Sequence, residues 1–374
     1  MHKAFYGQKW LEPEGVIFKM DIRIERTSRP KTKPDWNNLS FGRYYTDHMF
    51  VADYTEGSGW QDLRVIPYAP LSLDPAAMVF HYAMELFEGL KAYAAEDRRI
   101  LLFRPLENAR RLNSSAARIC MPGFPESDFL EALKTLVRME HDWVPRAPDT
   151  SLYLRPFMIA TEPHLGVRAS KQFQMLIIAS PVGAYYPEGL NPVKIYLEDE
   201  YVRAVRGGTG FTKCGGNYAA SLIAQKKAEK LGFTQVLWLD GVEKKYIEEV
   251  GTMNVMFQIG DEVITPELGD SILPGVTRSS VIEVLRSWDV RVSERRISID
   301  ELHSAARSGA LRESFGTGTA AVISPIGAFN INGELLRVAD GDIGPLSRKL
   351  YDTLTGIQWG RLPDPFGWTC EVPL

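Results

Sequence analysis

Cysteine is scarce in this sequence, with only Cys120, Cys214 and Cys370 among 374 residues. An odd number without CxxC or CxxH spacing argues against a disulfide framework and a structural zinc site, and it indicates a reducing compartment. The six histidines show neither HExxH nor HxH spacing, so we expect no metal site. Cys214 has no histidine nearby in the sequence that would activate it as a nucleophile.

Two other features are missing: an excess of positive charge and a long hydrophobic run. The formal net charge is −4, whereas a general nucleic-acid binder is normally basic. No apolar run approaches the roughly 18 residues that a membrane-spanning helix needs. Residues 1–9 hold no uninterrupted apolar segment like that of a secretory signal. We therefore expect a cytoplasmic protein that binds neither nucleic acid nor membrane.

The composition that is present is that of an ordinary globular protein, 45% hydrophobic and 24% charged. The 374 residues exceed the roughly 150 of a typical domain, so two domains are expected. Segment 181–189 has proline and glycine at both ends, which is typical of an interdomain connection. We predict an N-terminal domain over residues 1–182, an interdomain loop over 183–192 and a C-terminal domain over 193–374.

Local patterns predict both helices and strands in each half of the chain, and hence an α+β class. On the second predicted helix the apolar positions share one face, made of Phe129, Leu130, Leu133, Leu136 and Val137. The predicted strands are 90–95, 100–103, 151–159, 172–179, 234–239, 245–249, 252–259, 262–265 and, as the final sheet segment, 320–323. The predicted helices are 105–120, 127–140, 219–231, 274–288 and a segment from the capping box of Ser298 and Glu301 to just before Gly309.

Lys213 lies in a glycine-rich stretch, with glycines at 207, 208 and 210 on one side and at 215 and 216 on the other. Glycines let a large ligand approach the backbone and allow conformations that other residues find strained. A lysine that such a site partly desolvates becomes a better nucleophile toward a carbonyl, as in the lysines that form Schiff bases. The alternative is a glycine-rich surface turn that happens to carry a lysine.

A Schiff-base lysine is most useful with pyridoxal phosphate, which needs a phosphate site, an acid near its ring nitrogen and a donor for its ring oxygen. The helix that starts after 274–275 offers free N–H groups to a phosphate, and Arg111 can add a bidentate charge. Side chains alternate along a strand, so one carboxylate of Glu248 and Glu249 can face a pocket while the other faces solvent. The hydroxyl of Tyr218, at the start of a helix, is a candidate donor.

Two further segments suit a substrate that carries a carboxylate. The turn at 316–320 can present consecutive N–H groups to an anion. Tyr153 and Arg155 share one face of a predicted strand, which places an arginine beside an aromatic ring. Taken singly, each of these features is also typical of plain turns, solvated charges or packed aromatic side chains.

Together and in this order, these segments resemble the branched-chain amino acid aminotransferases, members of the class IV (fold-type IV) pyridoxal phosphate enzymes. The resemblance runs from about Phe41 to Ile357, and its most specific pieces are residues 85–92, 213–218, 249–254, 273–278 and 318–320. It implies a smaller N-terminal α+β domain and a larger C-terminal cofactor-binding domain with a mixed, barrel-like sheet and helices. It also implies a homodimer whose active sites lie between the domains.

The resemblance assigns roles to individual residues. It implies that Lys213 is the catalytic residue and forms the Schiff base, that Glu249 rather than Glu248 faces the ring nitrogen, and that Tyr218 bonds the ring oxygen. Arg111, not Arg110, matches the phosphate-binding arginine. The other cofactor contacts that it implies are Val276, Thr277, Gly318 and Thr319. The substrate contacts that it implies are Phe41, Tyr82, Phe87, Tyr153, Arg155, Tyr185, Thr252, Thr319 and Ala320.

Within the substrate contacts, the resemblance implies that Thr319 and Ala320 receive the α-carboxylate and that Arg155 holds the distal carboxylate of glutamate. The implied activity is a reversible ping-pong transamination of L-leucine, L-isoleucine and L-valine with 2-oxoglutarate. Ala321 and Ser324 stand where the mammalian branch carries a redox-active CxxC, so that switch is expected to be absent.

Two alternatives remain open at this point. One is another class IV enzyme, either a D-amino-acid transaminase or an aminodeoxychorismate lyase, which shares the lysine and the glutamate but differs in its substrate pocket. Residues 153–155 and the long first domain favour the branched-chain interpretation over it. The other is a non-catalytic binding protein on the same scaffold, against which the intact lysine, glutamate and phosphate segments argue.

Overall fold

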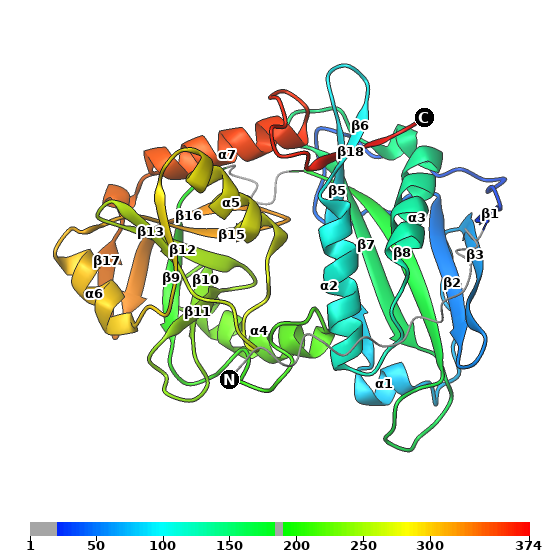
Figure 1. Cartoon of the computed structure of the whole chain (residues 1–374), viewed down its shortest axis with the longest axis horizontal. Helices are drawn as coiled ribbons and strands as arrows, with labels where there is room; N and C mark the ends of the chain where they lie inside the picture. Colours follow the sequence, from blue (N-terminus) through cyan, green and yellow to red (C-terminus); the bar gives the residue numbers. More distant parts are fainter. Residues whose placement is uncertain (1–20, 184–189) are drawn as a thin grey trace.

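The computed structural model describes residues 21–183 and 190–374, which form two nine-stranded sheets side by side (Figure 1). In the first sheet the order is β1-β3-β2-β8-β7-β5-β6-β18, with β4 beside β7, and all described pairs are antiparallel except β1 with β3. Its strands are β1 (Arg23–Ile24), β2 (His48–Thr55), β3 (Gly59–Pro67), β4 (Glu85–Phe87), β5 (Leu90–Ala94), β6 (Ile100–Phe103), β7 (Ser151–Ala160), β8 (Gln172–Val182) and β18 (Thr369–Val372).

The helices of the first sheet are α1 (Met78–Tyr82), α2 (Pro105–Arg118) and α3 (Glu126–Met139), followed by the short 3-10 helix η1 (His141–Trp143). Pro105 opens α2, where its fixed φ and missing N–H suit the first helical position. On α3 the side chains of Phe129, Leu133 and Leu136 are fully buried in the core of this sheet. Each contributes roughly 1.5–3 kcal/mol by leaving water. The predicted apolar face of this helix is confirmed.

The second sheet is mixed, with the order β11-β10-β9-β16-β15-β12-β13-β14 and with β17 beside β16. β9 runs parallel to β10 and to β16, and β13 runs parallel to β14, whereas the other described pairs are antiparallel. Its strands are β9 (Val193–Glu198), β10 (Gln235–Leu239), β11 (Ile247–Val250), β12 (Asn254–Ile259), β13 (Glu262–Thr265), β14 (Arg291–Glu294), β15 (Leu311–Gly318), β16 (Val322–Ile331) and β17 (Glu334–Arg337).

The helices of the second half are α4 (Gly215–Lys230), α5 (Val276–Ser287), α6 (Ile299–Arg307) and α7 (Pro345–Gln358), with the 3-10 helix η2 (Ala339–Gly341). The predicted capping of α6 is present, because the Oγ atom of Ser298 accepts the N–H of Glu301 at 3.1 Å. Gly232 follows α4 with a φ of +83°, a conformation that favours glycine and stops the helix.

One hydrophobic cluster joins the two sheets through α5 and α7. Tyr93 of the first sheet packs in the same buried group as Leu285 of α5 and Leu354 of α7. The chain then returns to the first sheet, where β18 pairs with β6 and sets Cys370 opposite Leu102. This shared core fixes how the two sheets face each other across the cavity described below.

The structure confirms the fold class and most predicted elements, with two differences. Helix α4 begins at Gly215 instead of residue 219, because the Glu85 carboxylate accepts the Gly215 N–H at 2.5 Å and stabilises a helix start that two glycines disfavour. Strand β16 covers Val322–Ile331 rather than 320–323, and it is not the last sheet segment, since β17 and β18 follow. Pro325 and Gly327 lie inside it, and both residue types normally argue against a strand.

The domain boundaries at 182 and 193 stay a prediction, and β18 places the end of the chain in the first sheet. Across residues 21–183 and 190–374, no helix has the length and apolarity that would let it cross a membrane.

Candidate active site

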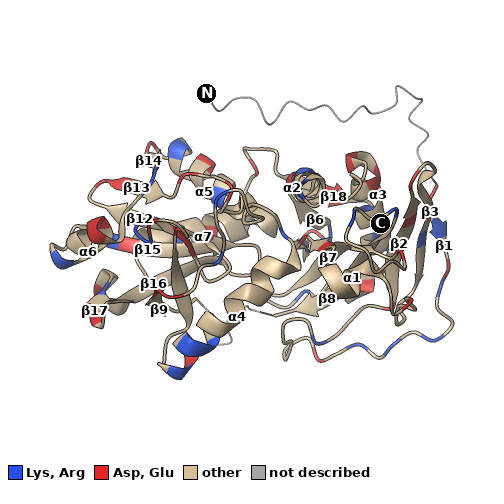
Figure 2. Cartoon of the chain, turned by 90° about the horizontal axis from the view of Figure 1, so that it is seen from below, with Lys and Arg blue, Asp and Glu red and all other residues tan. Residues whose placement is uncertain are grey.

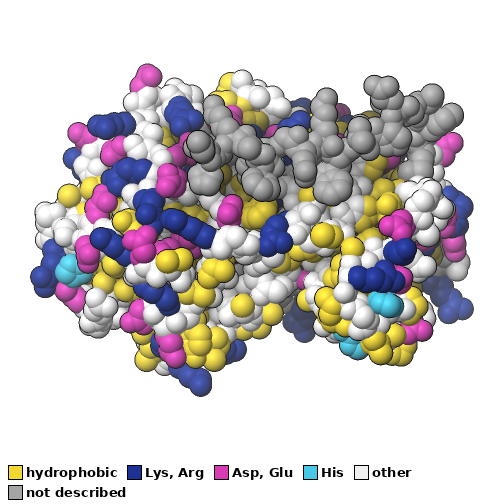
Figure 3. Space-filling model, turned by 60° about the horizontal axis from the view of Figure 1, so that its bottom comes forward, with side chains coloured by type: hydrophobic (Ala, Val, Ile, Leu, Met, Phe, Trp, Pro, Cys, Tyr) yellow, Lys and Arg dark blue, Asp and Glu magenta, His cyan; other side chains and the backbone are white. Residues whose placement is uncertain are grey.

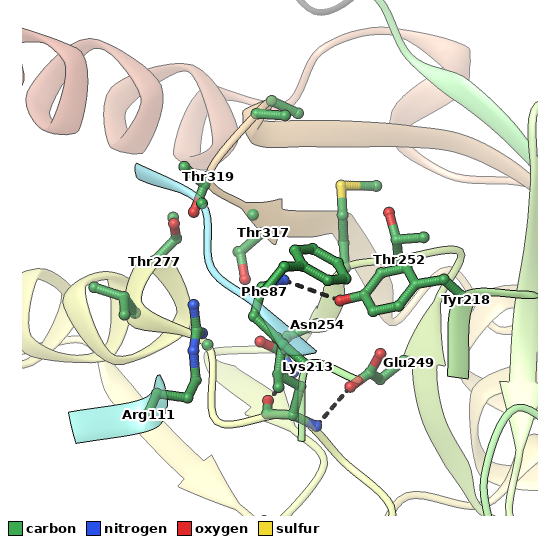
Figure 4. A pocket seen from close by; sticks show the side chains of 18 of the residues that line it. Phe87, Arg111, Lys213, Tyr218, Glu249, Thr252, Asn254, Thr277, Thr317 and Thr319 are labelled. Atoms are coloured by element: carbon green, nitrogen blue, oxygen red, sulfur yellow. Dashed lines mark hydrogen bonds between the residues drawn. The ribbon is translucent and has the colours of Figure 1, made fainter. Parts of the chain in front are cut away.

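A cavity of about 440 Å³ lies between the two sheets, at the N-terminal end of α5 (Figure 4). The sequence-predicted residues that line it are Phe41, Phe87, Arg111, Tyr153, Arg155, Lys213, Tyr218, Glu249, Thr252, Val276, Thr277, Gly318, Thr319 and Ala320. Residues not predicted for the site also line it: Gly89, Met253, Asn254, Leu273, Gly275, Thr317 and Ala321. The structure thus brings together segments that lie far apart in the sequence.

Two predicted substrate contacts are not among these lining residues. Tyr82 ends α1, and its hydroxyl donates to the carbonyl oxygen of Leu165, outside the cavity. Within one chain this side chain does not reach the space near Lys213. Tyr185 lies outside the described residues.

The side chain of Lys213 projects into the cavity, where its Nζ atom donates to the Tyr218 hydroxyl at 2.9 Å (Figure 4). The same nitrogen lies 4.6 Å from the centre of the Phe87 ring. The backbone is held by the first half of the chain, since the Lys213 N–H donates to Ser115 at 3.1 Å and its carbonyl accepts the Phe87 N–H at 3.0 Å. The amine is therefore fixed in place while remaining open to a ligand.

The loop before Lys213 is held by the first turn of α4. The Asn217 side chain donates to the carbonyl oxygens of Thr209 at 2.8 Å and Thr212 at 3.0 Å. Gly210 is required by close approach, because a Cβ atom there would lie 2.5 Å from the carbonyl oxygen of Ser271. The glycines around the lysine thus allow two loops to touch at Gly210.

Glu249 is buried with 3% of its surface exposed, at the end of β11. Its Oε1 atom accepts the N–H of Leu273 at 2.8 Å, and its Oε2 atom lies 3.2 Å from Nε of Arg203. Burial raises the pKa of this carboxyl group, against the opposing effects of Arg203, the Leu273 N–H and Lys213. The expectation that Glu248 faces solvent is wrong, because this residue is also buried and accepts a hydrogen bond from Ser271.

Arg111 and Glu88 form a buried bidentate ion pair, with Nε–Oε1 and Nη2–Oε2 distances of 2.7 and 2.8 Å. The remaining Nη1 atom of Arg111 donates to the carbonyl oxygen of Pro274 at 3.0 Å, beside the start of α5. Burial alone would raise the pKa of Glu88, but Arg111, Lys213 and Asn108 hold it below its ordinary value. Arg110 instead points to solvent and pairs with Glu107, as expected if Arg111 is the residue that serves the site.

An anion site is formed by the N-terminus of α5 and the end of β15. The helix starts after Gly275 without any side-chain cap, which leaves its first N–H groups free near Val276 and Thr277. The Oγ1 atom of Thr317 is buried without a hydrogen-bond partner. Gly275 allows the loop to pass the Asn254 side chain, whose Oδ1 atom would lie 2.0 Å from an added Cβ.

The turn at Thr319 and Ala320 joins β15 to β16 and is held by an unexpected buried lysine. The Nζ atom of Lys91 donates to the carbonyl oxygen of Ala320 at 2.9 Å, and Lys91 is only 6% exposed. Burial lowers the pKa of Lys91 to about 8. A cation therefore sits directly behind the turn that is predicted to bind a carboxylate.

The depressed pKa of Lys91 predicts how stability changes with pH. Between about pH 8 and 10.5 the unfolded chain holds this proton while the folded protein has released it, so stability rises with pH across that window. Relative to the Lys91→Met variant, the wild-type free energy of unfolding should increase by about 2 kcal/mol from about pH 7.5 to 9.5. Urea denaturation of both proteins at the two pH values measures this difference. An unchanged difference between the proteins would contradict the low pKa.

The apolar part of the cavity is lined by Phe41, Phe87 and Tyr153. The rings of Phe41 and Tyr153 meet edge to face, with their centroids 4.9 Å apart. Arg155 lies over the Phe87 ring at 4.6 Å, and its Nη2 atom donates to the Tyr153 hydroxyl at 3.0 Å. Its Nε atom is buried without a partner, so the guanidinium group retains a free donor.

The residues that sequence reasoning missed are those that hold the predicted ones. Glu88 anchors Arg111, Arg203 contacts Glu249, and Lys91 supports the turn at Ala320. Glu88 and Lys91 lie inside the recognised segment 85–92, so their charges between apolar neighbours were a usable signal of burial. Arg203 lies in an irregular segment and carried no such signal.

Comparison with known proteins gives consistent matches. The family described as amino-transferase class IV matches residues 85–329. A Bacillus subtilis (strain 168) protein named branched-chain-amino-acid aminotransferase 2 is 59% identical over 354 residues, which are 95% of this chain and 98% of that protein. A Mycolicibacterium smegmatis protein named branched-chain-amino-acid aminotransferase is 50% identical, over 90% of this chain and 92% of its own.

A solved structure is similar in both fold and sequence. It is a branched-chain amino acid aminotransferase with pyridoxamine 5'-phosphate, from a source abbreviated T.th., and its TM-score is 0.72 at 26% identity. The match covers 86% of this chain and 98% of that chain.

Proposed function

This chain belongs to the amino-transferase class IV family, and from that premise we propose that it transfers the amino group of L-leucine, L-isoleucine and L-valine to 2-oxoglutarate. The products are the branched-chain 2-oxo acids and L-glutamate, and pyridoxal phosphate is the cofactor. The observation that carries the proposal is that the Lys213 amine, the buried acid Glu249 and the anion site beside Arg111 share one cavity with apolar walls.

The residues of the cavity fit pyridoxal phosphate. Arg111 and the free N–H groups at the start of α5 would hold its phosphate, and the unpartnered Thr317 hydroxyl offers a further donor. Glu249 would face the ring nitrogen and Tyr218 the ring oxygen, while Lys213 would attach the cofactor through Nζ. When bound, the cofactor supplies an aldehyde and a ring that withdraws electrons from the substrate Cα atom.

The chain contributes the proton transfers and the geometry. The Nζ atom of Lys213 takes the proton from the substrate Cα atom and later acts as an acid, a role that typically contributes about 10²–10⁴-fold. The Tyr218 hydroxyl, 2.9 Å away, orients this nitrogen. One 2-oxo acid leaves before the other enters the same cavity, which makes the reaction ping-pong.

Substrate recognition is divided between the turn and the aromatic wall. The backbone N–H groups of Thr319 and Ala320 would bind the α-carboxylate, with the buried charge of Lys91 behind them. Phe41 and Tyr153 suit a branched apolar side chain. The free donor of Arg155 would bind the distal carboxylate of glutamate or 2-oxoglutarate.

The exposed face of α4 supports the proposal that the protein is a homodimer. Leu222 and Ile223 are 61% and 54% exposed on this helix, although such side chains are usually buried. Figure 2 shows that charges gather at the C-terminal end of α4 and leave the rest of the helix uncharged. Hydrophobic side chains also gather on the underside of the molecule, where α4 and α1 lie (Figure 3). Three free cysteines fit the cytoplasm that we propose as its compartment.

A substrate panel tests this function. With 2-oxoglutarate as acceptor, we expect kcat/KM for L-leucine, L-isoleucine and L-valine to exceed that for D-alanine by about 10²-fold or more. Glutamate formation measured with each donor, and without any donor as a control, gives these values. Faster consumption of D-alanine would instead indicate a D-amino-acid transaminase, and no activity with any donor would contradict transamination.

A further inference from the structure

Arg203 is a buried arginine to which the proposed mechanism gives no role. Its Nη2 atom donates to the carbonyl oxygens of Gly210 at 3.0 Å and Ser271 at 2.5 Å. Its Nε atom lies 3.2 Å from Oε2 of Glu249. This last contact is an ion pair without the alignment of a hydrogen bond, since Nε has no hydrogen-bond partner. The side chain is thus held rigidly on one side and charge-paired on the other.

These contacts connect the three segments that converge on the cofactor site. Gly210 belongs to the loop that leads to Lys213, Glu249 ends β11, and Ser271 belongs to the loop that leads through Leu273 to α5. Arg203 itself is not among the residues that line the cavity. It therefore reaches a cofactor only through the residues that it contacts.

Glu249 depends on a nearby cation because it is fully buried. Burial favours the protonated carboxyl group, and among the groups around it Arg203 opposes that effect most strongly. The Leu273 N–H and Lys213 also favour the ionised form, whereas Glu248 disfavours it. A carboxyl group that has taken up a proton loses its attraction for a protonated ring nitrogen. The charge of Arg203 thus bears directly on the interaction assigned to Glu249.

We propose that Arg203 is a positioning residue, which keeps Glu249 ionised and aimed at the ring nitrogen of pyridoxal phosphate. This inference rests on the proposed function. Arg203 acts through the carboxylate of Glu249, and its hydrogen bonds to Gly210 and Ser271 serve to hold the guanidinium group in place. The charge of the side chain, more than its ability to donate hydrogen bonds, is what the cofactor senses.

Two variants separate charge from hydrogen bonding. Arg203→Gln keeps donors for the loop carbonyls but has no charge, whereas Arg203→Lys keeps the charge. The Kd of each enzyme, freed of cofactor, is measured for pyridoxal phosphate and for its 1-deaza analogue, in which carbon replaces the ring nitrogen. We expect Arg203→Gln to weaken binding of pyridoxal phosphate about 30-fold and that of the analogue less than about threefold. Arg203→Lys should stay within about threefold of wild type for both ligands.

A double-mutant cycle and a matched control complete the test. In a Glu249→Gln background, Arg203→Gln should weaken pyridoxal phosphate binding by no more than about twofold further, because its effect passes through that carboxylate. Arg104→Met removes an arginine that bonds Ser280 and Glu283, away from Glu249, and should leave both affinities within about twofold.

The remaining outcomes overturn the inference. Equal loss of both ligands in Arg203→Gln, full persistence of its effect without Glu249, or wild-type behaviour of Arg203→Gln would each leave Arg203 with no role in charging Glu249. Failure of the proposed function gives a different result, since the wild-type enzyme itself would then bind no pyridoxal phosphate or transfer no amino group.

Discussion

Replacing Lys213 by alanine should lower kcat for L-leucine with 2-oxoglutarate by about 10⁴-fold or more. The change removes the only amine that contacts Tyr218 in the described cavity, and with it both the covalent attachment of the cofactor and the base for the Cα proton. The visible absorbance of the bound cofactor should be altered in the same variant. Initial rates and absorption spectra of the purified protein measure both effects.

A surface lysine provides the control for this variant. Lys226 lies on α4 with an exposed side chain that pairs with Glu229, so Lys226→Ala should retain wild-type activity and spectrum. If Lys213→Ala kept near-normal turnover, the assignment of the catalytic lysine would be wrong.

Replacing Glu249 by glutamine should lower kcat by about 10³-fold. Glutamine has nearly the same shape and can still accept the Leu273 N–H, but it carries no charge to keep a ring nitrogen protonated. The effect should therefore fall on the chemical step, which single-turnover kinetics with L-leucine measure directly. Circular dichroism establishes that the variant is folded.

Glu248 offers a matched control one residue away. It is also buried, but its carboxylate accepts a hydrogen bond from Ser271 and does not line the cavity. Glu248→Gln should keep kcat within about tenfold of wild type. Similar losses in the two variants would mean that the strand end needs buried acids for folding and would contradict a specific role for Glu249.

Local motifs predicted the residues whose chemistry is visible in a short segment. Lys213 stands out among glycines, and the alternation of side chains on a strand separates Glu249 from Glu248. The structure brings Lys213, Glu249 and Arg111 to one cavity. The alternation did not predict that Glu248 is buried as well, because the solvent-facing side of that strand is decided by the loop around Ser271.

The supporting contacts were beyond such reasoning. Arg203 meets Glu249 only after two segments far apart in the sequence fold together, and no local pattern marks either partner of that ion pair. Tyr82 shows the opposite case, in which a recognised position lies outside the cavity because α1 directs its hydroxyl to Leu165. Side-chain direction at the end of a short helix depends on tertiary packing, which periodicity does not encode.

The fold was predictable where periodicity was strong and continuous. The helix from Glu126 to Met139 and the hairpin of β5 and β6 are confirmed because their apolar positions follow one period throughout. Helix α7 was missed although Leu350, Leu354 and Ile357 carry a helical spacing. Strand β18 was missed for a physical reason, since a four-residue strand has too few side chains to show a period and is defined by its partner β6.

Reduction of the holoenzyme with borohydride, followed by peptide mapping, tests the central claim most directly. The account predicts that the reduced cofactor is found on the peptide that contains Lys213, bound to Nζ of that residue. Cofactor trapped on a different lysine, or on none, would contradict it.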